Sequence, residues 1–193
     1  MQLQTLKPFG PTILKTKIPE KLLHDINNYV EELISNKKKI DDLDFGNNLA
    51  GDVTQEFLLD SNFIKEVGWL DFLGKCTFEW IKKDLNKEIK KFNVLSSWVV
   101  RQYQNEYNPV HWHNGHISGA AFLKVPKNLG DYSQKENKSG RAYKGGNLNF
   151  IHGAKMFLSE SVISVKPEVG DIYFFPNYLM HTVYPFKNTH EER

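Results

Sequence analysis

The residues that follow Val94 restrict the possible folds more than any other part of the chain. They form short runs rich in β-branched and aromatic side chains, each bounded by Gly, Pro or Asn. Runs of this kind predict β-strands. Because no helical pattern separates them, they favour an antiparallel sandwich or barrel over alternating βαβ units. The predicted strands are residues 97–103, 117–125, 147–150, 161–165, 171–175 and 181–184.

The first half of the chain has helical periodicity instead. Pro19 precedes a segment whose apolar residues have the spacing of one buried stripe on a helix: Leu22, Leu23, Ile26, Val30, Leu33 and Ile34. A second helix is predicted over residues 70–91, and residues 37–48 are interpreted as a charged, turn-rich connection. We therefore expect an α+β, mainly β fold in a single domain of residues 1–193. Residues 1–93 would form mainly helical support packed on one sheet, and residues 94–193 the β core.

The composition argues against several classes of protein. With 25 Lys and Arg against 23 Asp and Glu, the net charge of +2 does not suit a nucleic-acid binder that must neutralise many phosphates. The single cysteine, Cys76, excludes an internal disulfide and a Cys-based zinc site, and its helical context predicts a buried thiol. The N-terminus lacks a signal-peptide pattern, and no run approaches the ~18–20 apolar residues of a membrane span. We expect a cytoplasmic protein with no membrane partner.

Three histidines lie within the six residues HWHNGH, at positions 111–116. Alternate residues of a strand share a face, so His111 and His113 are predicted to present their imidazoles side by side. A third histidine, His181, begins the last predicted strand, after a buried strand that proline ends. A chain reversal over residues 176–179 would bring His181 back beside the other two. Histidine is the commonest metal-ligating side chain, and the three predict a metal site.

The ligand type suggests iron(II), although alternatives remain open. Iron(II) oxygenases commonly bind their metal with two histidines and one carboxylate on one face of an octahedron. Here His113 stands where the acid would be, which leaves the site more positive by one unit charge. His116 is an alternative ligand, because Asn114-Gly115 is a strong turn signal that would place His116 beside His113. A polar loop that binds no metal is the third reading.

Several ordered motifs resemble those of a known family. They are NPVHWHNG at residues 108–115 with Tyr103 and Tyr107 before it, the segment 117–126 ending in FLKVP, and the short segments 145–148, 170–176, 181–183 and 192–193. Over about residues 94–193 the chain resembles a family of 2-oxoglutarate- and Fe(II)-dependent oxygenases, relatives of prolyl 4-hydroxylases known from phages and marine bacteria.

The resemblance implies a fold, cofactors and further site residues. The fold would be a double-stranded β-helix, a cupin-like jelly roll with the metal inside, and the cofactors Fe(II), 2-oxoglutarate and O2. Arg193 would bind the distal carboxylate of 2-oxoglutarate, a role that suits the bidentate, charge-assisted pairing of a guanidinium with a carboxylate. Tyr103 resembles the tyrosine that lends its hydroxyl to the same carboxylate, and Ser118 is a further candidate for the co-substrate pocket.

The implied activity is hydroxylation of a small-molecule or peptidyl substrate, with peptidyl proline suggested by the prolyl hydroxylase relatives and with succinate and CO2 as products. Two alternatives stay open: a cupin-like metal enzyme that does not use 2-oxoglutarate, and a non-enzymatic jelly-roll binding module. Residues 128–146 are polar and contain several glycines, so we interpret them as a surface loop that covers the substrate.

Overall fold

The computed structural model describes residues 3–6, 10–127, 129, 145–187 and 189–193. The surface loop predicted at residues 128–146 lies almost entirely outside these described residues, so it remains a prediction. Among the described helices, none combines the length and the apolar character that crossing a membrane would require.

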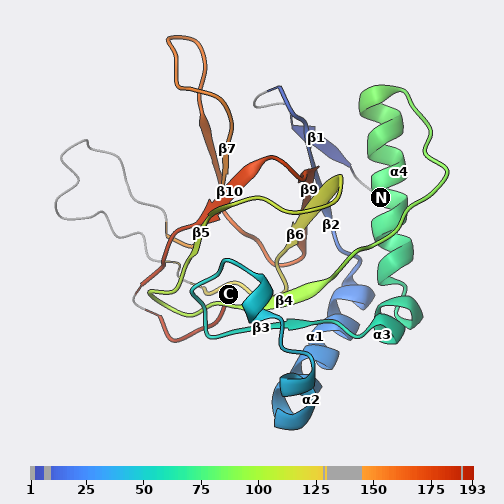
Figure 1. The fold of residues 1–193 in the computed structure, drawn as a ribbon, viewed down its shortest axis with the longest axis vertical. Coiled ribbons are helices and arrows are strands. Elements are labelled where there is room, and N and C mark those ends of the chain that lie inside the picture. Colours follow the sequence, from blue (N-terminus) through green and yellow to red (C-terminus); the bar gives the residue numbers. More distant parts are fainter. Residues whose placement is uncertain (1–2, 7–9, 128, 130–144, 188) are drawn as a thin grey trace.

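Two four-stranded antiparallel sheets form the centre of the molecule (Figure 1). The helix-facing sheet has the order β1-β2-β9-β6, with bounds Gln4–Leu6, Ile13–Lys17, Asp171–Pro176 and Ile117–Ala121. The histidine sheet has the order β5-β10-β7-β8, with bounds Asn108–His111, Met180–Val183, Leu148–Ile151 and Val162–Val165. A separate two-stranded ribbon pairs β3 (Gln55–Leu58) with β4 (Trp98–Arg101).

The two sheets face each other across a shared apolar core. Tyr173 and Phe175 of β9 pack there against Leu148 and Phe150 of β7 and Val183 of β10. Since successive strand residues point to opposite faces, the alternate residues of the helix-facing sheet point outward. Those outward residues, Leu14, Ile172 and Phe174, belong to a second core that the helices complete.

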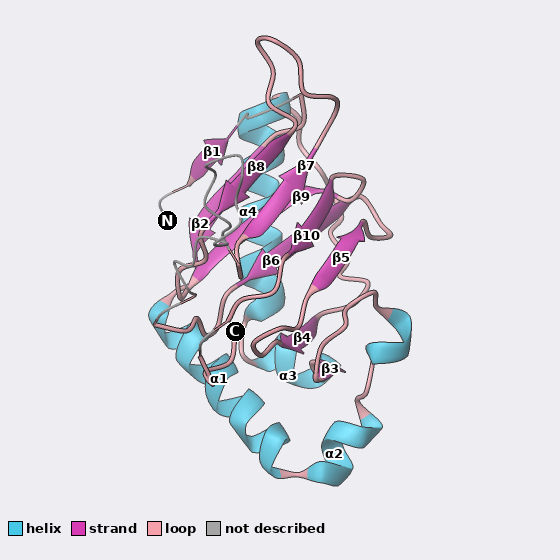
Figure 2. Cartoon of the chain, turned by 90° about the vertical axis from the view of Figure 1, so that its left-hand side faces the viewer, coloured by secondary structure: helices cyan, strands magenta, loops and turns pink. Residues whose placement is uncertain are grey.

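The helices cover the outer face of the helix-facing sheet, and Figure 2 shows α4 running behind the strands. Helix α1 (Glu20–Ser35) follows Pro19 and buries the predicted stripe, Leu22, Ile26, Val30 and Leu33. Helix α4 (Trp69–Leu85) buries Trp69, Phe72, Cys76 and Trp80, which confirms the buried thiol. Two short helices, α2 (Lys37–Asp42) and α3 (Ser61–Glu66), and a 3-10 turn at Gly46–Asn48 complete the set.

The expected antiparallel sheets, with helices packed on one of them, are confirmed. The described strands do not close into a barrel, so the double-stranded β-helix stays a prediction at that level of detail. Three predictions about the first half were wrong. β1, β2 and β3 were not expected there, residues 37–48 contain α2, and the second helix ends at Leu85 rather than residue 91. Asn86 adopts a left-handed conformation that ends α4, and the charged residues after it have no apolar stripe to bury.

Candidate metal centre

The predicted histidines lie together at one end of the histidine sheet. His111 ends β5 and His181 lies directly opposite it on β10. His113 follows two residues after β5. The ring centroids of His111 and His181 are 4.2 Å apart, and those of His113 lie 4.9 and 5.0 Å from the other two. One ligand nitrogen from each ring lies within 4.8 Å of the others, so the three imidazoles can converge on one ion.

Backbone hydrogen bonds set the tautomers of two of these rings. Nδ1 of His111 lies 2.7 Å from the Pro109 carbonyl oxygen, and Nδ1 of His181 lies 3.0 Å from the Leu179 carbonyl oxygen. A carbonyl only accepts, so both Nδ1 atoms carry the proton and donate it. Each Nε2 atom is then left with a free lone pair, which is the arrangement that backbone partners commonly impose on metal-binding histidines.

The third imidazole completes the arrangement. Nε2 of His113 lies 3.1 Å from Nε2 of His181. Because His181 is protonated at Nδ1, the hydrogen bond between them is donated by His113, and a metal ion would replace that proton. Two nitrogens bound at right angles to one ion at about 2.1 Å are about 3.0 Å apart. The observed separation therefore fits two neighbouring positions of an octahedral metal.

Burial keeps these ligands uncharged. It lowers the pKa of His113 to about 4 and that of His181 to about 3, with a smaller contribution from the neighbouring His111. Both imidazoles are neutral at pH 7, as metal coordination requires. The Trp98 ring lies 5.3 Å from His113 and the Phe175 ring 4.9 Å from His181, so apolar walls border the triad on two sides.

His116, the alternative ligand, lies outside this cluster. It is exposed in the turn before β6, and the described group of three potential metal ligands does not include it. Sequence reasoning missed Asn177, which fixes the backbone of His113. The His113 amide donates to the Asn177 carbonyl at 3.2 Å, and the Asn177 side-chain amide donates to the His113 carbonyl at 3.0 Å. The sequence signal for Asn177 was its position in the turn between Pro176 and the predicted strand at residues 181–184.

Arg193 is half-buried and has an incomplete set of partners. Its Nη1 donates to Oε1 of Gln102 at 3.0 Å, and its guanidinium carbon lies 4.9 Å from the centre of the Phe122 ring. Nε is buried without a hydrogen-bond partner. Burial lowers the pKa of Arg193 to about 10, so the group remains a cation at neutral pH. A half-buried cation with a buried, unsatisfied donor fits a site for a carboxylate.

The other two predicted co-substrate residues occupy different surroundings. Ser118 lies opposite Phe175 in the β6–β9 pair and so shares its face, which is the one that borders His181. The Tyr103 hydroxyl accepts a hydrogen bond from Nη2 of Arg101 at 2.6 Å and donates one to Oε2 of Glu192 at 3.1 Å. Both hydrogen bonds of the Tyr103 hydroxyl are thus made to the ion pair between Arg101 and Glu192.

That ion pair belongs to a cluster that fastens the segment carrying Arg193. Glu192 binds Nε of Arg101 at 2.8 Å and Nζ of Lys124 at 2.5 Å, and Lys124 also contacts Glu31 on α1. Burial alone would raise the pKa of Glu192, but the hydrogen bonds from Lys124 and Arg101 outweigh it and the pKa is lowered. The backbone of Arg193 also pairs with that of Gln102. The Arg193 amide donates to the Gln102 carbonyl at 2.9 Å, and the Gln102 amide donates to the Arg193 carbonyl at 3.1 Å.

Glu192→Gln is expected to lower the melting temperature at pH 7 by roughly 2–8 °C, the shift for about 1–2 kcal/mol in a domain of this size. A depressed acid contributes stability that is complete above its ordinary pKa of 4.5 and is lost as the pH falls through its lower folded value. The deficit should therefore shrink as the pH falls below 4.5, measured by thermal unfolding. Glu79→Gln, an exposed control, should leave the curve unchanged. Equal stability of the two variants at pH 7 would contradict this role.

Comparisons with known proteins agree with the fold and show the family. A family model described as "Putative 2OG-Fe(II) oxygenase" matches residues 96–193. The crystal structure of a Pseudomonas putida prolyl-4-hydroxylase is similar to this chain with a TM-score of 0.58 and 13% sequence identity, covering 94% of this chain and 87% of that one. At that identity the likeness shows the fold alone. Among curated proteins, none matches the chain in sequence. Since the matched residues make up just over half of its length, the chain belongs to the 2OG-Fe(II) oxygenase family.

Proposed function

We propose that this chain is a 2-oxoglutarate- and Fe(II)-dependent dioxygenase that hydroxylates a small-molecule or peptidyl substrate and releases succinate and CO2. One observation carries the proposal. His181 and the incompletely paired guanidinium of Arg193 border the same apolar core, since Phe175 beside His181 and Phe122 beside Arg193 both belong to it. A metal site and a carboxylate site in one interior suit a metal-chelating dicarboxylate.

The residues present fit both groups. His111, His113 and His181 would hold the iron, and Arg193 would hold the distal carboxylate of 2-oxoglutarate. When bound, iron and 2-oxoglutarate together supply oxidative decarboxylation and the oxidising power for hydroxylation. The chain supplies orientation: the carbonyls of Pro109 and Leu179 fix two of the rings, and Asn177 fixes the backbone of the third. Phe175 and Trp98 provide apolar contacts to His181 and His113.

Three neutral ligands change the charge balance of such a site. In the usual set a carboxylate offsets one positive charge of the metal, and here His113 offsets none. The dianionic co-substrate would supply the missing negative charge, with Arg193 balancing its far end. Iron and 2-oxoglutarate should consequently bind more tightly together than either does alone.

The proposal is tested by incubating the purified full chain with iron(II) and 2-oxoglutarate. Under nitrogen, the mixture should develop the weak visible absorption band of a chelated complex. In air it should form succinate slowly without added substrate. A protein that binds iron but forms neither band nor succinate would be a metal enzyme of another type. A protein that retains no transition metal would be a binding module. Either result would overturn the proposal.

Peptidyl proline is the first substrate to test. It is proposed because the similar Pseudomonas putida structure is that of a prolyl-4-hydroxylase. Proline-containing peptides that accelerate succinate formation, and gain one oxygen atom by mass, would support it.

A further inference from the structure

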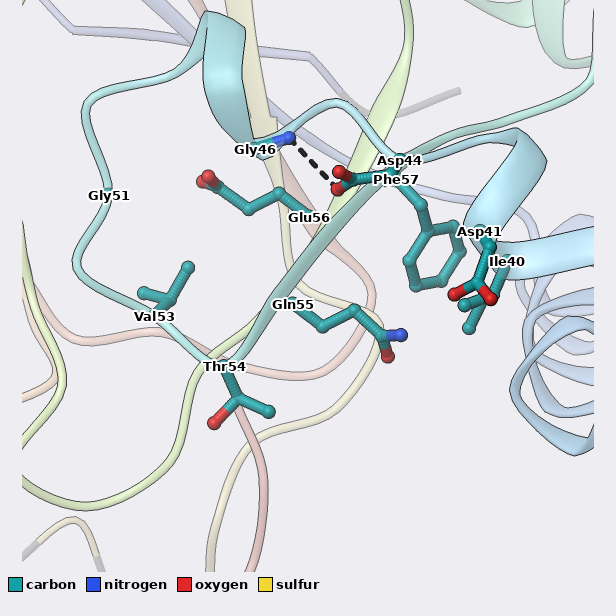
Figure 3. Close-up of a pocket in the computed structure, with 10 residues that line it drawn as sticks. All are labelled: Ile40, Asp41, Asp44, Gly46, Gly51, Val53, Thr54, Gln55, Glu56 and Phe57. Carbon is teal, nitrogen blue, oxygen red and sulfur yellow. Dashed lines mark hydrogen bonds between the residues drawn. The ribbon is translucent and has the colours of Figure 1, made fainter. Parts of the chain in front are cut away.

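A carboxyl-lined cavity of about 340 Å³ lies beside β3 (Figure 3), and no residue of the histidine triad lines it. Its walls include Asp44, Gly46, Gly51, Val53, Thr54 and Glu56, and none of its lining residues is a lysine, arginine or histidine. A cavity with negative groups and no positive ones favours a cationic ligand.

Glu56 is the residue that requires an explanation. It is only 4% exposed, and no hydrogen bond or ion pair engages its carboxylate among the described residues. Burying a carboxyl group without a partner is costly. Burial, reinforced by Asp44, raises the pKa of Glu56 to about 7. The chain therefore maintains a buried acid that its own residues leave unpaired.

Two glycines lie against this carboxylate, and Gly51 has no space for a side chain. A Cβ on Gly51 would lie 2.7 Å from Oε1 of Glu56 and 2.8 Å from Oδ1 of Asn108, and a Cβ on Gly46 would lie 4.0 Å from Oε2 of Glu56. Figure 3 shows the Glu56 side chain extending toward Gly46 and Gly51, on the other side of β3 from Ile40 and Asp41. The carboxylate and the Asn108 carbonyl thus form a pair of acceptors that meet over a residue without a side chain.

The β3–β4 ribbon connects this acceptor pair to the triad. Glu56 lies opposite Val100 and Leu58 opposite Trp98, so the side chain of Glu56 is on the same face of the ribbon as Trp98. The Trp98 ring is the one that borders His113, at 5.3 Å. The Glu56 carboxylate is therefore on the side of the ribbon that faces the metal centre.

Asn108 connects the acceptor pair to the triad by a second route. In the β5–β10 pair, His111 lies opposite His181 but Asn108 lies opposite Val183, so β5 contains one extra residue between them. His181 and Val183 share a face, and so their partners His111 and Asn108 also share one. Without the shift in register, residues three apart on a strand would point to opposite faces.

We infer that this cavity binds the protonated amine or guanidinium of a basic side chain on the substrate at the Glu56 carboxylate, with the Asn108 side-chain carbonyl as a second acceptor beside the cavity. This inference rests on the proposed function, because it assigns the cavity to the substrate of the same enzyme. A metal ion suits the cavity poorly, since Asp41, Asp44 and Glu56 do not converge as the triad does. An organic cation with several spread donors, such as guanidinium, matches separated acceptors.

The binding experiment uses the full chain without iron or 2-oxoglutarate, so that it is independent of turnover. Nα-acetyl-arginine amide and Nα-acetyl-lysine amide are titrated by calorimetry at pH 8, where Glu56 is mostly ionised. Nα-acetyl-citrulline amide, of nearly the same shape as the arginine probe but uncharged, is the matched neutral probe. We expect at least one cationic probe to bind at least tenfold more tightly than the citrulline probe. Equal binding of all three, or binding of none, overturns the inference.

Two variants locate the site. Glu56→Gln should reduce binding of the cationic probe at least tenfold, and Gly51→Ala should do the same, because its methyl group would overlap the Glu56 and Asn108 oxygens and displace them. Glu66→Gln, which removes one exposed negative charge from α3, should bind like the wild type. Wild-type binding by Glu56→Gln overturns the assignment.

Thermal unfolding, measured in parallel, distinguishes a variant that has lost binding from one that has lost its fold. Glu56→Gln removes a buried, unpaired charge, so its melting temperature at pH 8 should equal or exceed that of the wild type. Failure of the two proposals is also distinguishable. Loss of succinate formation would refute the oxygenase activity and leave the probe titration intact, whereas failure of the titration would leave succinate formation unaffected.

Discussion

His181→Ala is expected to reduce iron(II) binding by at least about 100-fold and to abolish succinate formation. Loss even of a residue that only orients a metal ligand costs about 10–100-fold in affinity, and a direct ligand costs more. His181 is the most buried member of the triad, at 5% exposure, and its Nε2 lies 3.1 Å from that of His113. Removing it leaves two ligands and an apolar gap. Anaerobic titration with iron(II), followed by metal analysis after gel filtration, measures the loss.

His116→Ala is the matched control for this result. It removes an imidazole from the same short segment, but one that is exposed and outside the cluster. Iron binding and succinate formation should remain at the wild-type level. If His116→Ala lost iron and His181→Ala kept it, the triad would be assigned wrongly and the alternative ligand would be correct.

Arg193→Ala is expected to raise the KM for 2-oxoglutarate by about 30- to 5000-fold while iron still binds. Truncating one partner of a buried charge pair costs about 2–5 kcal/mol, which corresponds to this range. The Nε atom of Arg193 has no partner within the described protein, so the variant loses little other than its contact with Gln102 and the Phe122 ring. Succinate formation measured against 2-oxoglutarate concentration gives the KM, and anaerobic titration checks the iron.

Arg193→Lys separates charge from geometry in the same experiment. Lysine keeps the positive charge but lacks the planar fork that binds a carboxylate through two hydrogen bonds. Its KM should therefore fall between those of the wild type and the alanine variant. An unchanged KM in Arg193→Ala would remove the arginine from the co-substrate site and favour a metal enzyme that does not use 2-oxoglutarate.

Part of the metal centre could be predicted from local sequence. The proline-ended strand before His181 indicated the reversal that places His181 opposite His111. Strand alternation does not place His113, because β5 ends at His111 and Asn177 holds the His113 backbone in the loop that follows. The family expected from the ordered motifs is confirmed by the match over residues 96–193. Ligand identity and co-substrate binding stay proposals that the variants above test.

The parts that sequence did not predict depend on tertiary contacts. β2 reads as ILKTK, five residues in a helical neighbourhood, and its strand conformation is fixed by pairing with β9 and β1. Glu56 looks like an ordinary surface acid in the sequence. Its burial arises only when the loop containing Gly46 and Gly51 closes over β3. Asn177 likewise acquires its role only from its position beside His113.

The extra residue in β5 divides that strand into two halves with separate tasks. Downstream of it, His111 must keep its place opposite His181, because a slip of one residue would turn the imidazole out of the interior. Upstream, Asn108 pairs with Val183 in a register shifted by one residue. Exchanging the amino acid at position 108 could therefore retune which molecules the pocket accepts without disturbing the metal ligands. In a programme of directed evolution, this position and Gly51 would be the first to randomise.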